Sequence, residues 1–246
     1  IAGRYEDFSD VGSIFKPKVA MAWVMNDNAM IRGAYSGGFK APGLPQTTAV
    51  DVARSNTRSD PVTQTSRGTL ELRNGSDSLS PEESENYSFG IVLTPMKDLT
   101  LTVDWWEIQQ ENTVGILSSQ TLILYDALLR SQGSEYENVI RDENNEIVYI
   151  RNDYTNLLPR EISGVDYSVD YRFETEMGNF SVKLSAANLT KFDQGTDAIT
   201  AMVLEAQDAG NEALLYEGDQ VSISGTSGSL IRQNERPKWR ANLSLG

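Results

Sequence analysis

The sequence contains no cysteine and no histidine. Their absence excludes disulfides, thiolate chemistry, zinc sites built on these residues and any histidine-based catalytic triad. It also contains no run of about 20 consecutive apolar residues, which a membrane-spanning helix needs. A membrane-spanning strand needs only about 9–11 residues, and its apolar residues alternate with polar ones. The missing apolar run therefore leaves strand-based membrane proteins open.

Positive charge is also scarce, with 21 Lys and Arg against 35 Asp and Glu and a net charge of -14. A protein that binds nucleic acid needs a basic surface to contact the phosphates, so we expect no nucleic-acid partner. The sequence starts at Ile1 without a signal peptide and stops at Gly246 within a strand pattern. From these ends we expect a fragment of a longer protein.

Residues arranged for catalysis are missing as well. Neighbouring carboxylates occur at Glu82, Glu83 and Glu85 and at Asp142 and Glu143, but they lie in polar, turn-like sequence. We expect these groups to be solvated rather than held in the contrasting environments that acid–base chemistry requires. No G-x-S-x-G motif or P-loop is present. The sequence therefore predicts no enzyme, no catalytic residue, no metal site and no cofactor.

A two-residue alternation of apolar and polar side chains recurs along the chain. Over residues 99–105 the odd positions are apolar and the even positions are Thr or Asp, and residues 165–173 repeat this pattern. Such alternation is typical of strands with one dry and one wet face. Further stripes cover residues 19–25, 87–93, 180–186 and 238–245, with a weaker one over 29–35.

Short and long connections between these stripes strictly alternate. The short turns, rich in Asn, Asp, Gly or Pro, span residues 26–28, 95–98 and 175–178. The long polar segments span residues 40–80, 113–159 and 193–236. Short periplasmic turns and long extracellular loops are typical of outer-membrane barrels, whereas compact soluble domains rarely hold three connections this long. The sequence therefore predicts an all-β fold, a section of an antiparallel transmembrane β-barrel with long extracellular loops.

Aromatic residues on the apolar stripes fall near both ends of the predicted strands. Aromatic girdles at both membrane interfaces are expected, because their amphipathic rings favour the level of the lipid headgroups. The predicted lipid-facing girdle consists of Trp23, Tyr35, Tyr87, Trp105, Phe173, Phe180 and Trp239.

Charged residues on the polar stripes would line the interior of the barrel. We expect them to form ion pairs across strands more than contacts with a solute. The candidate lumen-facing residues are Lys18, Arg32, Asp104, Lys183, Lys238 and Arg240.

The long segments carry local structure of their own. Residues 117–130 lack Gly and Pro and predict a short helix. Residues 136–142 with 147–151 predict a hairpin, and residues 220–224 with 229–232 predict another. Loop tyrosines could stack on a solute, and the candidate contacts are Tyr125, Tyr136, Tyr149, Tyr154 and Tyr216.

Four segments resemble TonB-dependent receptors. Residues 36–45 (SGGFKAPGLP) resemble their G-F-R/K-A-P-x-L-P segment, and residues 79–87 (LSPEESENY) resemble their L-x-P-E-x-S/T-x-x-Y/W strand entry. Residues 99–108 resemble the following strand with paired aromatics, and residues 162–166 (ISGVD) resemble an S-G-[VI]-[DE] strand start. The order and spacing match the late part of the barrel, and the resemblance covers nearly the whole chain.

The resemblance implies an active importer in the outer membrane of a Gram-negative bacterium. The whole protein would be a barrel of about 22 strands closed by an N-terminal plug. It would bind a scarce solute, such as an iron chelate, a cobalamin or an oligosaccharide. Its partners would be outer-membrane lipid, that solute and the TonB–ExbB–ExbD complex, which acts through the plug. The sequence lacks a plug, a TonB box and the usual terminal strand, so we expect about eight wall strands, forming an open, curved sheet when alone.

Two other functions fit parts of the pattern. A passive, porin-like outer-membrane channel shares every physical feature of the predicted barrel. A soluble β-sandwich that binds or acts on carbohydrate would instead place its apolar stripes face to face across a core.

Overall fold

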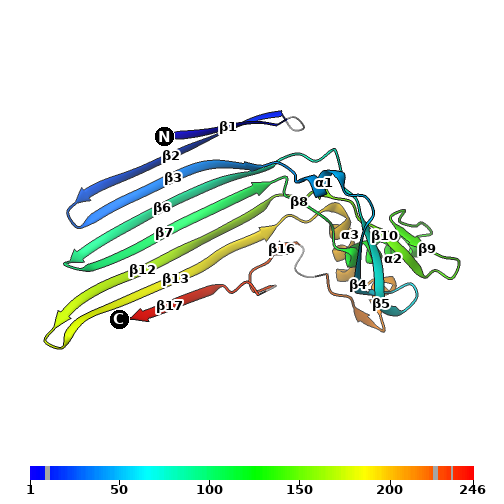
Figure 1. Ribbon diagram of the computed structural model, residues 1–246. Coiled ribbons are helices and arrows are strands. Elements are labelled where there is room, and N and C mark those ends of the chain that lie inside the picture. The colour runs from blue at the N-terminus through cyan, green and yellow to red at the C-terminus, as the bar shows by residue number, and fades with distance from the viewer. Residues whose placement is uncertain (9–11, 224–226, 234) are drawn as a thin grey trace.

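The computed structural model describes residues 1–8, 12–223, 227–233 and 235–246. Figure 1 shows two parts, a sheet of long strands and a compact group of helices and short strands at one end of that sheet. We call the second part the loop cap, because it is formed by described parts of the long connections between β3 and β6, between β7 and β12, and between β13 and β16.

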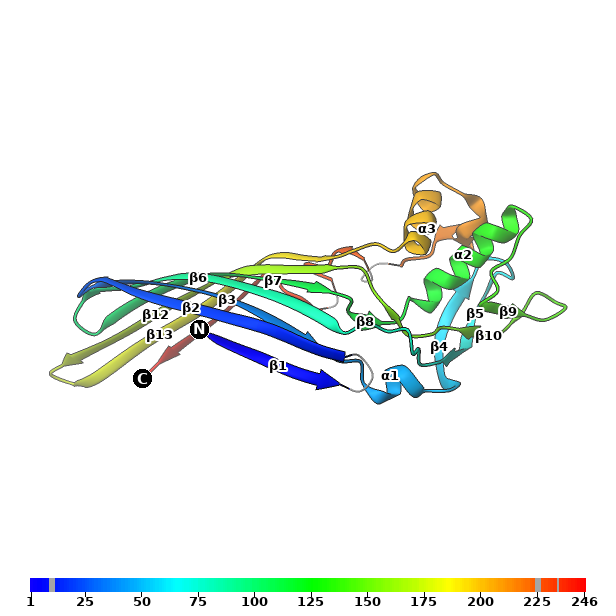
Figure 2. The same cartoon turned by 90° about the horizontal axis from the view of Figure 1, so that it is seen from above.

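The main sheet is antiparallel and open. Its order is β1-β2-β3-β6-β7-β12-β13, and both β16 and β17 pair with β13 at the last edge. Figure 2 shows that the sheet bends along its strands without closing on itself. The predicted fold class is therefore confirmed. The bounds are β1 Ala2–Phe8, β2 Gly12–Asn26, β3 Ala29–Lys40, β6 Glu82–Met96, β7 Leu99–Glu111, β12 Arg160–Thr175, β13 Gly178–Gln194, β16 Gly228–Ser229 and β17 Trp239–Leu245.

Tight turns join the strands at the end of the sheet opposite the loop cap (Figure 1). They link β2 to β3, β6 to β7 and β12 to β13. Asp98 and Gly178 adopt positive φ angles of 61° and 140°. Asp and Gly are residues that tolerate such backbone conformations, which explains their use where the chain reverses within a few residues.

Apolar side chains gather on one face of the main sheet. The register places Ile91 between Ile31 and Val103, so the stripes of neighbouring strands coincide. These side chains are not covered, and Met21 and Leu243 are 66% and 62% exposed. Among the described residues, every buried apolar side chain lies outside the long strands. The stripes therefore do not face each other across a core, and the β-sandwich alternative is wrong.

The loop cap contains the buried core of the molecule. A four-stranded sheet, β4-β5-β10-β9, packs beside two helices, α2 and α3. One apolar cluster joins Leu124 and Leu128 of α2 to Val203 of α3, and another joins Ile123 to Ile150. The elements are α1 Leu44–Thr48, β4 Val52–Asp60, β5 Thr65–Arg73, β8 Val114–Gly115, α2 Ser119–Ser131, β9 Val139–Arg141, β10 Ile147–Arg151, β11 Thr155–Asn156, α3 Ala198–Asp208, the 3-10 helix Glu212–Leu214, β14 Leu215–Tyr216 and β15 Asp219–Gln220.

The predictions of local structure within the loops had different outcomes. The helix at 117–130 is confirmed by α2, and the hairpin at 136–142 and 147–151 is confirmed by β9 and β10. The hairpin predicted at 220–224 and 229–232 is wrong, because β15 pairs with β14 and β16 pairs with β13. Residues 224–226 of that prediction lie outside the described residues.

The largest parts of the loop cap without a counterpart in the sequence-based expectations are one hairpin and one helix. These are the β4–β5 hairpin and α3, which lie in segments predicted from the sequence as long polar connections. Within the described ranges, no helix combines the length and apolar character needed to cross a membrane.

Candidate functional site

A row of charged side chains crosses the polar face of the main sheet. The register aligns Arg32 of β3 with Gly90 of β6 and Asp104 of β7. The Arg32 guanidinium donates to both carboxylate oxygens of Asp104, at 2.8 and 2.6 Å, although β6 lies between their strands. The same row continues to Asp166 of β12. Two of the six candidate lumen residues are thus brought into direct contact.

Glycine creates the space for this ion pair. A Cβ atom at Gly90 would overlap the Asp104 carboxylate, so any larger residue would push it aside. A similar arrangement occurs at Gly37 of β3, where a Cβ would lie 3.0 Å from the Lys16 side chain, which pairs with Glu83 of β6. Each of these glycines lies under an ion pair that joins the two strands flanking its own. Gly90 interrupts a strand of larger side chains, and that is the sequence signal that could have revealed the first crossing.

The other four candidate lumen residues are not brought together. Lys18, Lys183, Lys238 and Arg240 are exposed, and none of them forms an ion pair within the described part of the chain. Arg240 lies opposite Ala187, which in turn lies opposite Asp166. Of the six candidate lumen residues, Arg32 and Asp104 therefore form one pair, and the other four are cations without an ion pair in the described part of the chain.

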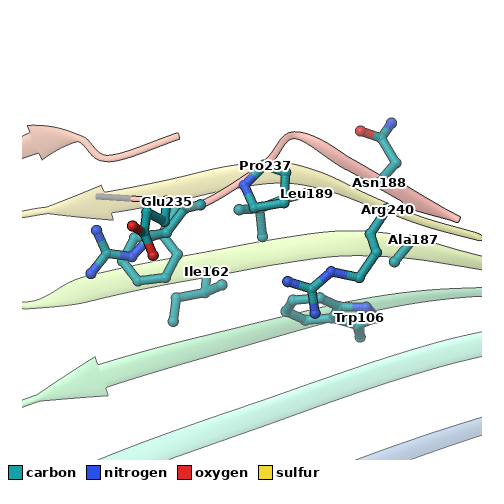
Figure 3. A pocket seen from close by; sticks show the side chains of 10 residues that line it. Trp106, Ile162, Ala187, Asn188, Leu189, Glu235, Pro237 and Arg240 are labelled. Atoms are coloured by element: carbon teal, nitrogen blue, oxygen red, sulfur yellow. The ribbon is translucent and has the colours of Figure 1, made fainter. Parts of the chain in front are cut away.

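A cavity of about 380 Å³ opens where β7, β12 and β13 meet the segment that precedes β17 (Figure 3). Trp106, Ile162 and Leu189 form an apolar floor, and Arg236 and Arg240 also line the cavity. A Cβ at Gly164 would lie 2.6 Å from the Trp106 ring. Gly164 therefore allows the indole to lie directly against the backbone of β12.

Arginines surround the aromatic end of this cavity. The Arg236 guanidinium lies 4.8 Å from the centre of the Phe192 ring, and that of Arg160 lies 5.8 Å from it. The Arg160 Nε also donates to Gln194 Oε1 at 2.8 Å. An apolar floor beside guanidinium groups can hold a molecule that combines apolar or aromatic parts with acceptor oxygens.

A second cavity of about 320 Å³ adjoins the first on the same face. Asp104, Asp166 and Asn242 line it with Ser168 and Ser185. Arg240 and Ala187 line both cavities, so the two spaces share a wall. The polar face thus offers an apolar compartment and a polar one side by side. Sequence reasoning missed Asp166 and Trp106, although both lie on the polar stripe in register with Asp104 and Gly164.

The predicted girdle aromatics lie on the apolar face. Tyr35 contacts Tyr87 with ring centres 5.2 Å apart, and Phe173 stacks on Phe180 at 5.6 Å. Trp23, Trp105 and Trp239 are exposed. Exposed aromatic rings on a sheet face without a second layer are what a lipid-facing girdle requires, and the girdle itself stays a prediction.

The five loop tyrosines all lie half-buried in the loop cap. Tyr125 meets Tyr136 with ring centres 5.1 Å apart and nearly perpendicular planes, whereas Tyr149, Tyr154 and Tyr216 make no such ring contact among the described residues. Burial raises the pKa of the Tyr136 phenol, which also accepts a bond from Asn138. Burial, followed by the nearby Glu217, raises the pKa of Tyr216. A role in solute contact stays a prediction for all five.

An ionic cluster that the sequence did not reveal holds the loop cap together. Arg141 donates to Asp60 at 2.6 and 2.9 Å and to Asp126 at 2.8 Å. The Arg141 and Asp126 side chains are 2% and 0% exposed. Desolvation lowers the pKa of Arg141, but the bonds to Asp60 and Asp126 outweigh it, and the net pKa is raised. Arg130 and the Tyr136 amide also donate to Asp126.

Carboxylates elsewhere in the cap act as local acceptors. Asp142 receives the amides of Asn144 and Glu146 and so closes the β9–β10 turn. In the described ranges, no three His, Cys, Asp or Glu side chains gather in a way that could hold a metal ion.

Comparisons with solved structures find siderophore receptors. The siderophore receptor PirA from Acinetobacter baumannii has a TM-score of 0.52 and 16% identity, covering 80% of this chain and 25% of that chain. A mutant of the ferric enterobactin receptor PfeA from Pseudomonas aeruginosa has a TM-score of 0.53 and 13% identity, and the match covers 76% of this chain and 23% of that chain. The siderophore receptor PirA from Pseudomonas aeruginosa has a TM-score of 0.51 and 14% identity, and the match covers 77% of this chain and 32% of that chain. At these identities the likeness concerns the fold.

The chain spans about a quarter to a third of the length of these receptors. No curated protein matches it. A family model described as "TonB dependent receptor-like, beta-barrel" matches residues 1–246, the full length of the sequence. With its antiparallel sheet, exposed apolar face and charged polar face, the chain belongs to the TonB-dependent receptor β-barrel family.

Proposed function

We propose that the protein containing this chain imports a scarce solute across the outer membrane of a Gram-negative bacterium, with energy supplied by the TonB–ExbB–ExbD complex. Members of its family are transport receptors rather than enzymes. The observation that carries the proposal is the two-faced sheet, whose exposed apolar face suits lipid and whose other face carries charges and cavities.

In this proposal the chain supplies barrel wall and part of the solute path. The two cavities that share Arg240 lie on the face that would line the lumen. The first of them lies near the ends of β12 and β13 that lead into the loop cap (Figures 1 and 3). A solute that passes the loops would meet the Trp106 floor and the arginines before the polar compartment. Iron chelates, with apolar parts and acceptor oxygens, suit that order of surfaces better than a cobalamin or an uncharged oligosaccharide.

Uptake by the intact receptor in paired tonB⁺ and tonB⁻ strains tests the proposal. The strains receive ⁵⁵Fe as chelates of different charge, and labelled cobalamin and maltooligosaccharide in parallel. We expect uptake of one solute class that depends on tonB. Equal uptake in both strains would instead identify a passive channel.

The wall residues can be tested in the same assay. Arg240→Gln removes the cation shared by both cavities, and Lys18→Gln is the matched control, since Lys18 is also an exposed and unpaired cation. We expect Arg240→Gln alone to raise the solute concentration for half-maximal uptake, because the other substitution lies outside both cavities. Equal effects of the two substitutions would contradict the assignment of Arg240.

A further inference from the structure

A groove of about 320 Å³ runs between α2 and α3 on the surface of the loop cap. Figure 2 shows the two helices beside each other at the end of the molecule away from the tight turns. On one side the groove is lined by Tyr125, Leu128 and Leu129 of α2 and by Gln132, which directly follows the helix. On the other side it is lined by Met202, Glu205 and Ala206 of α3 and by Ala209, which directly follows that helix.

Both sets share the spacing i, i+3, i+4 and i+7. Residues at this spacing form one continuous stripe along a helix. The groove is therefore bounded by one stripe from each helix, and most of its lining is apolar. Such a surface, between two helices, is the form of site that receives the apolar side chains of a third, amphipathic helix.

The groove is already formed by the packing beneath it. Leu124 and Val203, both 0% exposed, lie under the two stripes. Asp197 caps the start of α3, accepting from the Thr200 amide at 2.9 Å and from its hydroxyl at 2.6 Å. Because the helices are held in place, a ligand would not have to order them, and that cost is removed from binding.

Glu205 is the one charged residue among those that line the groove, and the α3 segment that forms its rim is acidic. Residues 193–219, which contain α3, include seven acidic residues and no Lys or Arg. Glu205 lines the groove, and Asp208 and Glu212 follow it along the chain. The nearest cation on α2, Arg130, is already bonded to the buried Asp126. The charge of this rim complements a basic ligand and opposes an acidic one.

We propose that the α2–α3 groove binds an amphipathic helical segment of another protein, with apolar side chains entering the groove and Lys or Arg side chains meeting the acidic rim. This interaction surface lies on the loop cap, away from the sheet cavities assigned to the solute. It is independent of the import proposal, so either can fail without the other.

The test uses the intact receptor in nanodiscs and a fluorescein-labelled helical peptide of leucine and lysine at amphipathic spacing. A second peptide carries glutamate in place of every lysine. Fluorescence anisotropy measures both affinities, with empty nanodiscs subtracted to remove binding to lipid. We expect the lysine peptide to bind and the glutamate peptide to bind at least about tenfold more weakly.

Substitutions at exposed positions locate the binding without disturbing the fold. Met202→Asp changes a groove residue that is 49% exposed, and its matched control is Val148→Asp on β10, which is 51% exposed and outside the groove. Glu205→Lys reverses charge in the groove, and Glu143→Lys does so in the β9–β10 turn. We expect the two groove variants to weaken binding about tenfold and the two controls to leave it within about twofold.

Equal weakening by Glu143→Lys would show attraction to bulk negative charge alone and would overturn the proposal. Unchanged binding in Met202→Asp would do the same, because the apolar entry would be absent. Access from outside is checked with Met202→Cys, since this chain has no other cysteine. Failure of a maleimide to label that position above the level of the unsubstituted receptor would mean that another part of the receptor fills the groove, which also contradicts the proposal.

Discussion

Removing the Arg141 guanidinium should destabilise the loop cap while leaving the main sheet intact. The substitution Arg141→Met leaves a side chain of similar length but takes the charged partner from Asp60 and Asp126. Both carboxylates are at least 95% buried, so water cannot replace the lost bonds without opening the cap. Breaking a buried ion pair by removing one partner costs about 3–5 kcal/mol. Asp126 keeps Arg130, which favours the lower end of that range.

Hydrogen exchange with mass spectrometry on the intact receptor reports this change by segment. A loss of about 3–5 kcal/mol corresponds to exchange faster by about two hundred-fold to several thousand-fold, as long as opening of the cap governs exchange. We expect this acceleration in α2, α3 and the β9–β10 hairpin, and not in β6, β7, β12 and β13. The cap would thus behave as one cooperative unit, separate from the wall.

The control is Arg67→Met, which removes another cap ion pair, with Glu146. The Arg67 and Glu146 side chains are 47% and 31% exposed, and exposed pairs contribute about 0–1 kcal/mol. Its exchange should therefore change by less than about fivefold. Equal effects of the two substitutions, or acceleration spread evenly over cap and wall strands, would refute the reasoning that the buried cluster holds the cap.

Three further predictions concern the wall and the loop cap. Gly90→Ala should displace Asp104 and lower barrel stability by about 1–3 kcal/mol, measured as a lower urea midpoint of unfolding; an unchanged midpoint would contradict the crossing ion pair. Leu184→Arg, on the apolar face, should cost about 2–4 kcal/mol in lipid, whereas Ser185→Arg on the polar face should cost little, and the same unfolding assay compares them. Burial favours the neutral form of the Tyr136 phenol and so raises its pKa. The contribution of this phenol to the stability of the cap is therefore complete below the ordinary pKa of about 10, and it is lost as the pH rises through the higher pKa of the folded state. In Tyr136→Phe, cap stability should no longer fall as the pH rises, and hydrogen exchange between pH 9 and 11 measures this. An equal fall in the variant would contradict the role given to Tyr136.

The wall could be predicted from the sequence because its signal is local. The alternation in a stretch such as residues 99–105 depends only on residues of that one strand. The register between strands then follows from matching their apolar stripes, as in Ile31, Ile91 and Val103. The tight turns could be found in the same way, from the Asp and Gly residues that accept positive φ angles.

The loop cap could not be predicted because its contacts are distant in sequence. Arg141 and Asp60 are 81 residues apart, and each alone reads as an exposed charge in a polar segment. The parallel pairing of β10 with β5 likewise joins two different loops. The apolar floor of the cavity around Trp106 could not be predicted for a different reason. Trp106 lies on a polar stripe, and only the register with Gly164 shows that its ring has room to lie flat.

The ion pair over Gly90 ties together three strands rather than two. Arg32 and Asp104 belong to β3 and β7, so their bond is possible only while β6 presents its glycine between them. If β6 slid by two residues along its neighbours, Ser88 or Val92 would occupy that gap and block the bond. A slip by one residue would in addition turn the apolar stripe of β6 inward. A single glycine and one salt bridge therefore favour one strand pairing over its shifted alternatives.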